Sequence, residues 1–301
     1  MKMKTKIPML IAAILMCLGV ILCIVSLIMV DFDFGGLSNV KYESNEYVFE
    51  EPVRDLSVIT KTAKVNVLLA EDGVCRVVCK NEQSNAKHAV SMENGVLTVD
   101  FLDGRKWFEY LMFFSRSLSV TVYLPAGEYG ELVLSDRTGA VSVDNGLSFE
   151  KAKVSCSTGH ICFGASVANS LEIEMKTGDI RLKNLTAGAV TLSASTSDIE
   201  LENVRCENLC VDGKTGDIDL KRVLVNGKMD ISLSTGDIEL DACDAAELSL
   251  QTSTGDIEGS LLSGKDFHAK SDTGRIRVPD TRIGGRCEIS TATGDISIEL
   301  Y

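Results

Sequence analysis

An aspartate recurs at one position of a regular repeat in the second half of the chain. Nine versions of Thr-Gly-Asp-Ile follow one another in steps of 19 or 20 residues, beginning at Thr138, Thr158, Thr177, Thr196, Thr215, Thr235, Thr254, Thr273 and Thr293. Six copies carry aspartate after the glycine position: Asp179, Asp198, Asp217, Asp237, Asp256 and Asp295. If the repeats stack, these carboxylates form an acidic surface ladder. Closely spaced carboxylates repel one another and attract cations.

A second set of acids strengthens this acidic stripe, two residues further along each copy: Glu200, Asp219, Glu239 and Glu258. A calcium ion prefers six to eight oxygen ligands, and one carboxylate per repeat supplies too few. The glycine-aspartate nonapeptide of calcium-binding β-rolls is also absent. We therefore favour solvated turn residues over a specific ion site, and we predict no metal and no cofactor.

Catalytic residues are not indicated. The three histidines, His88, His160 and His268, have no nucleophile at a recognisable motif, and no phosphate-binding glycine loop is present. Polysaccharide-active enzymes do occur among elongated β-solenoids, and Asp179, Asp198 and Asp217 with Arg181 imitate such a site. Because these acids are periodic rather than singular, the sequence favours a protein that is not an enzyme.

The elements that position the acids follow from the repeat's phase. Counted from the glycine, positions +2 and +4 are apolar almost throughout, as at Ile180 and Leu182, and positions −7 and −5 behave likewise. Alternation with a period of two on both sides of a turn indicates two strands per repeat, each with one buried face. We predict an all-β fold, a right-handed single-stranded β-solenoid with coils of about 19 residues and two or three sides. The alternative is a sandwich of antiparallel hairpins.

Five regions are predicted along the chain. Residues 1–6 form a cytoplasmic tip, 7–30 a transmembrane helix, 31–45 a tether, 46–130 a strand-rich cap of the solenoid, and 131–301 the repeat array. The uncharged run 7–30 would form a helix of about 36 Å, enough to cross a bilayer. Lysines precede it and aspartates follow it, which places the N-terminus in the cytoplasm and the C-terminal domain outside the cell membrane. The alternative is a cleaved signal peptide.

The cap region contains five predicted strands and an aromatic run. The strands are 56–59, 65–69, 74–78, 96–101 and 118–124. The run comprises Trp107, Phe108, Tyr110, Phe113 and Phe114. We interpret this run as a plug for the open end of the solenoid. The alternative is an interface patch that faces the membrane or a partner.

Composition restricts the partners and the redox chemistry. A formal charge of −13 disfavours nucleic-acid binding, because phosphate contact needs a basic face. The ten cysteines do not fall at matching positions of neighbouring repeats, and no zinc spacing accompanies Cys75 and Cys79. We therefore predict free, mostly buried thiols, with Cys243 and Cys287 pointing inward and Cys162 and Cys210 outward.

The order of these parts resembles a bacterial family. An apolar helix is followed by strands that end in SLSVTVYLPAGEYGELVLSDRTGAVSV, and then by TGDI coils. Over 46–301 this is similar to the putative adhesin family, a domain of unknown function found in many Gram-positive envelopes. The family includes an accessory membrane protein of an envelope-stress operon. The resemblance implies a β-solenoid ectodomain with an envelope role and supplies no catalytic residues.

The favoured function is a membrane-anchored, non-enzymatic adhesin or envelope-binding scaffold. Its partners would be a cell-wall polymer, a matrix or another envelope protein. The first alternative is an accessory or regulatory protein of an envelope-stress system, and the second is a polysaccharide-active enzyme.

Overall fold

The computed structural model describes residues 6–29, 42–83, 85–104 and 117–301, which form one helix and eighteen strands. The helix α1 covers Lys6–Met29. Six strands lie between residues 42 and 104: β1 (Glu43–Phe49), β2 (Asp55–Ile59), β3 (Ala63–Leu69), β4 (Cys75–Glu82), β5 (Ala86–Glu93) and β6 (Val96–Asp103). Twelve lie between residues 117 and 301: β7 (Leu118–Leu124), β8 (Glu128–Val143), β9 (Ser148–Phe163), β10 (Ser166–Thr215), β11 (Ile218–Lys221), β12 (Leu224–Thr235), β13 (Ile238–Thr254), β14 (Ile257–Leu261), β15 (Asp266–Thr273), β16 (Ile276–Arg277), β17 (Arg286–Thr293) and β18 (Ile296–Leu300).

The chain divides into two units. One contains α1, and the other comprises Glu43–Gly104 and Ser117–Tyr301. The bounds of α1 nearly coincide with the helix predicted at 7–30. Within the described residues, no helix has the combination of length and apolar character that crossing a membrane requires.

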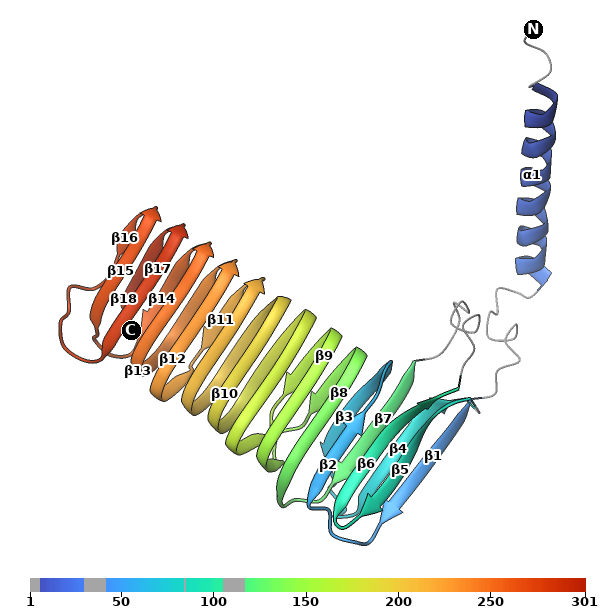
Figure 1. The fold of residues 1–301 in the computed structure, drawn as a ribbon, viewed down its shortest axis with the longest axis horizontal. Helices are drawn as coiled ribbons and strands as arrows, with labels where there is room; N and C mark the ends of the chain where they lie inside the picture. Colours follow the sequence, from blue (N-terminus) through green and yellow to red (C-terminus); the bar gives the residue numbers. More distant parts are fainter. Residues whose placement is uncertain (1–5, 30–41, 84, 105–116) are drawn as a thin grey trace. The chain divides into compact units, whose positions relative to one another are not determined.

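The repeat array is a parallel β-solenoid, as the repeat's phase predicts. Successive coils lie side by side from β8 to β13 (Figure 1), and each coil, here called a rung, pairs in register with the next. Ile161 pairs with Ile180, Ile199 with Ile218, and Ile238 with Ile257. These isoleucines are at most 1% exposed, and they form one continuous column of the core. Burial of one such side chain contributes about 2 kcal/mol.

Stacking order and chain order differ at both ends of the solenoid. At the C-terminal end, β17 pairs with β13 on one side and with β15 on the other. The last coil of the chain, β17 and β18, therefore lies between β13/β14 and β15/β16. At the N-terminal end the first coil is likewise inserted: β2 lies between β6 and β8, and β3 between β7 and β8. Repeat spacing does not indicate either insertion.

The N-terminal end carries a cap that is partly antiparallel. Strand β4 pairs antiparallel with both β1 and β7, and β5 pairs antiparallel with β6. The five strands predicted in this region correspond to β2, β3, β4, β6 and β7. The polar strands β1 and β5 were not predicted, and β1 begins at Glu43, inside the predicted tether. We call β1, β4, β5, β6 and β7 the cap.

Candidate functional site

The repeated aspartates lie at a turn whose glycines let the rungs approach closely. Gly216, Gly236 and Gly255 have φ angles of 125°, 135° and 147°. A Cβ atom on these residues would lie 2.1, 2.0 and 2.0 Å from a carbonyl oxygen of the preceding rung. Glycine is required here both for the left-handed backbone and for the contact between backbones.

The repeated aspartates, here called the aspartate ladder, lie one per rung, and four of their carboxylates bind the backbone N–H of the next aspartate. The Oδ1 atom of Asp198 accepts the N–H of Asp217 at 3.1 Å, and Asp217 accepts the N–H of Asp237 at 3.0 Å. Asp237 then accepts the N–H of Asp256, and Asp256 that of Asp295, both at 2.7 Å. Each carboxylate therefore satisfies an amide of the next rung that no backbone carbonyl reaches. The ladder stabilises the turn rather than presenting free carboxylates.

Basic side chains lie at both ends of this aspartate ladder. At one end, His160 Nδ1 lies 3.0 Å and Arg181 Nη2 3.5 Å from Asp179 Oδ2. At the other end, Asp295 Oδ1 accepts the backbone N–H of Arg275 at 2.8 Å, and the guanidinium binds Oδ2. The backbone N–H of Arg275, together with its guanidinium, lowers the pKa of Asp295.

The acids at position +3 form a separate acidic face. It consists of Glu200, Asp219, Glu239 and Glu258, which are aligned by strand register. Arg181 Nε pairs with Glu200 at 3.1 Å and Lys183 pairs with the same residue at 2.8 Å. Among the described residues, no basic group forms an ion pair with the other three acids.

The crowding of these carboxyl groups is reflected in the pKa values of two of them. Burial raises the pKa of Asp219, and the carboxylates of Asp217 and Glu200 raise it further. Burial also raises the pKa of Glu239, with Asp219 and Glu258 adding to the shift. Crowded carboxylates without counter-ions gain free energy when a cation approaches. The acidic face is therefore a better candidate for cation recognition than the aspartate ladder.

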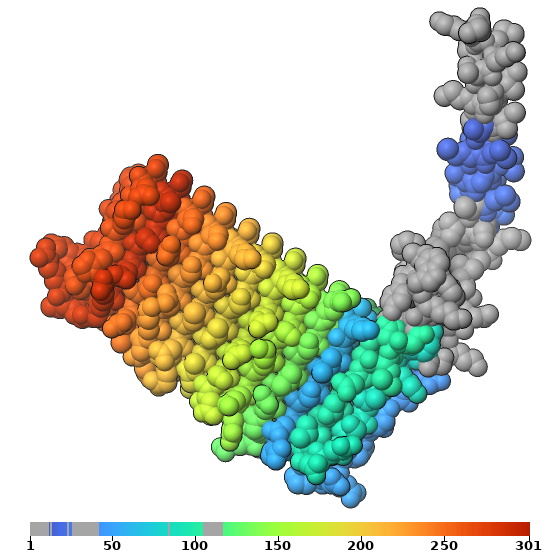
Figure 2. All heavy atoms as spheres, in the orientation of Figure 1, coloured from blue at the N-terminus to red at the C-terminus, as the bar shows by residue number. Residues whose placement is uncertain are grey.

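A shallow cleft of about 490 Å³ opens on the acidic face. It is lined by Asp219, Lys221, Glu239, Asp241 and Glu258, together with Leu220, Leu240 and Gly259. Gly259 stands where most other rungs have a branched apolar residue, and its φ is 138°. Figure 2 shows the regular rows of side chains that the stacked rungs present on one side of the solenoid.

Sequence reasoning missed a second ladder at the next corner of the coil. Asn184, Asn203 and Arg222 occupy position +6 with φ between 53° and 55°. The amide of Asn203 donates to Asn184 Oδ1 at 2.8 Å, and Arg222 Nε donates to Asn203 Oδ1 at 2.5 Å. The recurrence of asparagine, which tolerates this backbone region, after 19 residues was the available signal.

The structure tests the predicted orientation of four cysteines and shows where the three histidines lie. Cys243 and Cys287 are buried and Cys162 and Cys210 exposed, as their phase predicts, and all four are free thiols. Burial raises the pKa of Cys243 to about 11 and that of Cys287 to about 12, which disfavours the reactive thiolate. His160 and His268 are on the surface, whereas His88 is buried, contrary to the polar character of its sequence neighbourhood.

The predicted aromatic patch lies outside the described residues. Trp107, Phe108, Tyr110, Phe113 and Phe114 all fall in the interval 105–116. Both interpretations of that run stay predictions.

Solved structures share this fold at low sequence identity. A putative lipid binding protein from Parabacteroides distasonis has a TM-score of 0.52 and 14% identity, with 87% of this chain and 98% of that chain covered. A putative adhesin from the same species has a TM-score of 0.51 and 9% identity with the same coverage. A putative adhesin from Bacteroides fragilis has a TM-score of 0.47 and 15% identity, again with 87% and 98% covered.

Sequence comparison identifies the family. No curated protein is detectably similar to this chain. Residues 53–247 and 190–301, which together contain every strand from β2 to β18, match the profile of one domain family. The chain belongs to the Toastrack DUF4097 family.

Proposed function

We propose that this chain is a non-enzymatic binding scaffold of the bacterial envelope, an adhesin in the broad sense, and that its acidic face binds a cationic partner. The observation that carries this proposal is the run of Asp219, Glu239 and Glu258, which share a cleft and have no basic partner among the described residues. The in-register stacking of rungs holds these carboxylates at a regular spacing, which suits a repetitive or extended ligand.

The engagement of the aspartate ladder supports a role other than catalysis. A general acid or base needs a carboxylate that is free to exchange a proton with a substrate. Asp198 and Asp217 instead accept backbone amides of the next rung. These two aspartates therefore act as structural residues of the turn, and their contacts do not support the alternative of a polysaccharide-active site.

We also propose that the N-terminal helix anchors the scaffold in the cell membrane, with the solenoid outside the cytoplasm. The described side chains of α1 include exposed apolar residues on several sides, among them Leu15, Met16, Val20 and Leu22. A helix that is apolar all round requires an apolar environment. Extraction of the expressed chain from membranes by alkaline carbonate, without detergent, would contradict this anchoring.

Retention on envelope material tests the binding function. The full-length chain in detergent would be incubated with isolated envelope fragments at low salt, and the bound fraction measured. We expect retention that decreases with salt, because exposed charges are screened. The variant Asp219→Asn/Glu239→Gln/Glu258→Gln should lose most of it.

The matched control changes the same number of carboxylates elsewhere. Glu93, Glu150 and Glu247 are exposed and lie outside the acidic face, so their triple change to glutamine should leave retention intact. Equal loss in the two variants would contradict a specific role of the acidic face. Absence of wild-type retention would contradict the scaffold function itself.

A further inference from the structure

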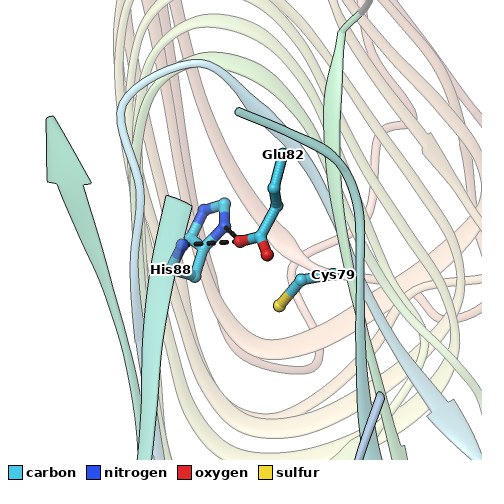
Figure 3. A group of neighbouring side chains, drawn as sticks. All are labelled: Cys79, Glu82 and His88. Carbon is cyan, nitrogen blue, oxygen red and sulfur yellow. Dashed lines mark hydrogen bonds and ion pairs between the residues drawn. The ribbon is translucent and has the colours of Figure 1, made fainter. Parts of the chain in front are cut away.

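Three buried side chains of metal-binding type meet inside the cap. They are Cys79 and Glu82 from β4 and His88 from β5, and each is at most 2% exposed. One donor atom from each residue lies within 4.8 Å of the other two. Figure 3 shows the sulfur, the carboxylate and the imidazole directed into the same space. The described residues contain one such group of mixed donors.

A β-bulge is the reason that Glu82 points inward. Residues of β4 alternate regularly up to Cys79, which is buried, so that Glu82 would face outward in an uninterrupted strand. Asn81 has a φ of 61°, and the register with β1 shifts between the pairs Glu43–Glu82 and Asn45–Cys79. The extra residue turns the Glu82 carboxylate toward Cys79. Bulges commonly redirect a side chain in this way next to functional sites.

Neighbouring groups hold the carboxylate in place. Glu82 Oε2 accepts a hydrogen bond from Asn45 Nδ2 at 2.6 Å. Glu82 Oε1 accepts the backbone N–H of His88 at 2.6 Å, and His88 Nδ1 lies 3.0 Å from the same oxygen. Hydrogen bonds from outside a metal site orient the ligands in this way. The other ring nitrogen, His88 Nε2, is buried and has no hydrogen-bond partner.

We propose that Cys79, Glu82 and His88 bind one divalent transition-metal ion of the zinc class. Sulfur, imidazole nitrogen and carboxylate oxygen are the ligand types that zinc prefers, whereas calcium and magnesium take oxygen ligands. In a tetrahedral zinc site with bonds of about 2.0–2.3 Å, donor atoms are separated by about 3.3–3.6 Å. The donor atoms lie within 4.8 Å of one another, so the side chains would move closer together on binding.

Charge balance favours the same occupant. A thiolate and a carboxylate carry two negative charges, and a divalent cation with neutral imidazole makes this buried group neutral. On binding, the Cys79 thiol loses its proton to solvent as the sulfur–metal bond forms, and no electron is transferred. The three protein ligands leave a fourth coordination position. The ion would join the end of β4 to the start of β5 and so stabilise the end of the solenoid.

Cobalt substitution and zinc analysis test the site in the full-length chain. The protein would be purified with a chelator, loaded with Zn²⁺ or Co²⁺, and separated from free metal. We expect one zinc per chain, a raised melting temperature, and a thiolate-to-cobalt charge-transfer band in the near ultraviolet. Absence of that band in the wild-type chain overturns the proposal, whether or not any variant folds.

Variants separate this site from surface binding by other thiols and histidines. Cys79→Ser and His88→Gln should each lose the bound zinc and the rise in melting temperature, and Cys79→Ser the charge-transfer band. The control Cys243→Ser removes an equally buried thiol that belongs to no such donor group in the described residues, and it should retain one zinc. Retention of zinc by Cys79→Ser, or its loss in Cys243→Ser, overturns the assignment. If the hydrogen bonds among Asn45, Glu82 and His88 alone stabilise this group, added metal will change neither the melting temperature nor the absorption spectrum. That result would also overturn the proposal.

Discussion

Arg275 Nη2 lies 2.8 Å from Asp295 Oδ2, although Arg275 precedes Asp295 by 20 residues and belongs to the rung outside it. Because β17 and β18 are inserted between β13/β14 and β15/β16, Asp295 donates its backbone N–H to Asp256 and accepts that of Arg275. The arginine that interrupts the sequence repeat therefore closes the aspartate ladder at the end of the solenoid. The apolar residues of this end rung are less buried than those of the inner rungs: Phe267 and Ala269 are only partly buried, and Ile276 is 42% exposed.

Removal of the last coil should release the rung outside it. Strand β15 pairs with β17, and β16 with β18. Truncation after residue 285 would therefore leave both without a partner, and the backbone amides of 266–273 should lose their protection. Hydrogen–deuterium exchange of the truncated and intact chains measures this. Undiminished protection of 266–273 would mean that β15 moves onto β13 in chain order, and that the insertion adds nothing to its stability.

Two glycine-to-alanine variants distinguish the energetic cost of a positive φ from the cost of a steric clash between rungs. Gly73 and Gly236 both have positive φ, 71° and 135°. A Cβ at Gly73 would meet nothing within 4 Å, whereas at Gly236 it would lie 2.0 Å from Gly216 O. Gly73→Ala should lower the free energy of unfolding by about 1–2 kcal/mol, the cost of left-handed backbone for a residue with Cβ. Gly236→Ala should lower it by more than about 3 kcal/mol. Chemical denaturation measures both, and equal effects would show that the contact between rungs adjusts freely.

The acidic face should make stability depend on pH in a defined direction. The pKa of Asp219 is raised by burial and by neighbouring carboxylates. A folded-state pKa above the unfolded value favours the fold at low pH, and this stability is lost as pH rises through the folded pKa. Asp219→Asn should therefore stabilise the chain at pH 7 by about 0.5 kcal/mol, a small figure because water still reaches this partly desolvated side chain and screens its charge.

The same change should have no stabilising effect below about pH 3, where the carboxyl group is protonated in both the folded and unfolded states. Melting temperatures of wild type and variant across this range provide the measurement. Glu150→Gln, an exposed acid on another part of the surface, is the control. A stabilisation by Asp219→Asn that persists at the lowest pH would exclude charge crowding as its cause.

The sequence was sufficient for the repeating part of the fold because its information is periodic. Isoleucine at +2 predicts the core column, and glycine and aspartate predict the turn. Stacking order at the ends was not predictable, because every rung carries the same pattern and β17 pairs as readily with β13 as with β15. Cys79, Glu82 and His88 were not recognised as a group, because their meeting depends on a bulge at Asn81 and on strand β5. No residue spacing encodes that geometry.

Ser197 is the one residue that replaces glycine in the nine turns, and it should be a point of weakness. Its backbone does not adopt the positive φ of glycines at the same position in neighbouring rungs. Its side chain is buried, and Oγ has no hydrogen-bond partner. An unsatisfied buried hydroxyl costs about 1–3 kcal/mol.

Ser197→Ala removes that hydroxyl without changing the backbone preference, so it should raise the free energy of unfolding by about 1 kcal/mol. Ser193→Ala, at an exposed position of the same rung, should change it by less than about 0.5 kcal/mol. Denaturant titration of the two variants measures whether the buried Ser197 hydroxyl lowers stability because it has no hydrogen-bond partner. A loss of stability in Ser197→Ala would mean that the hydroxyl has a partner in solution, such as a bound water that bridges it to the neighbouring rung.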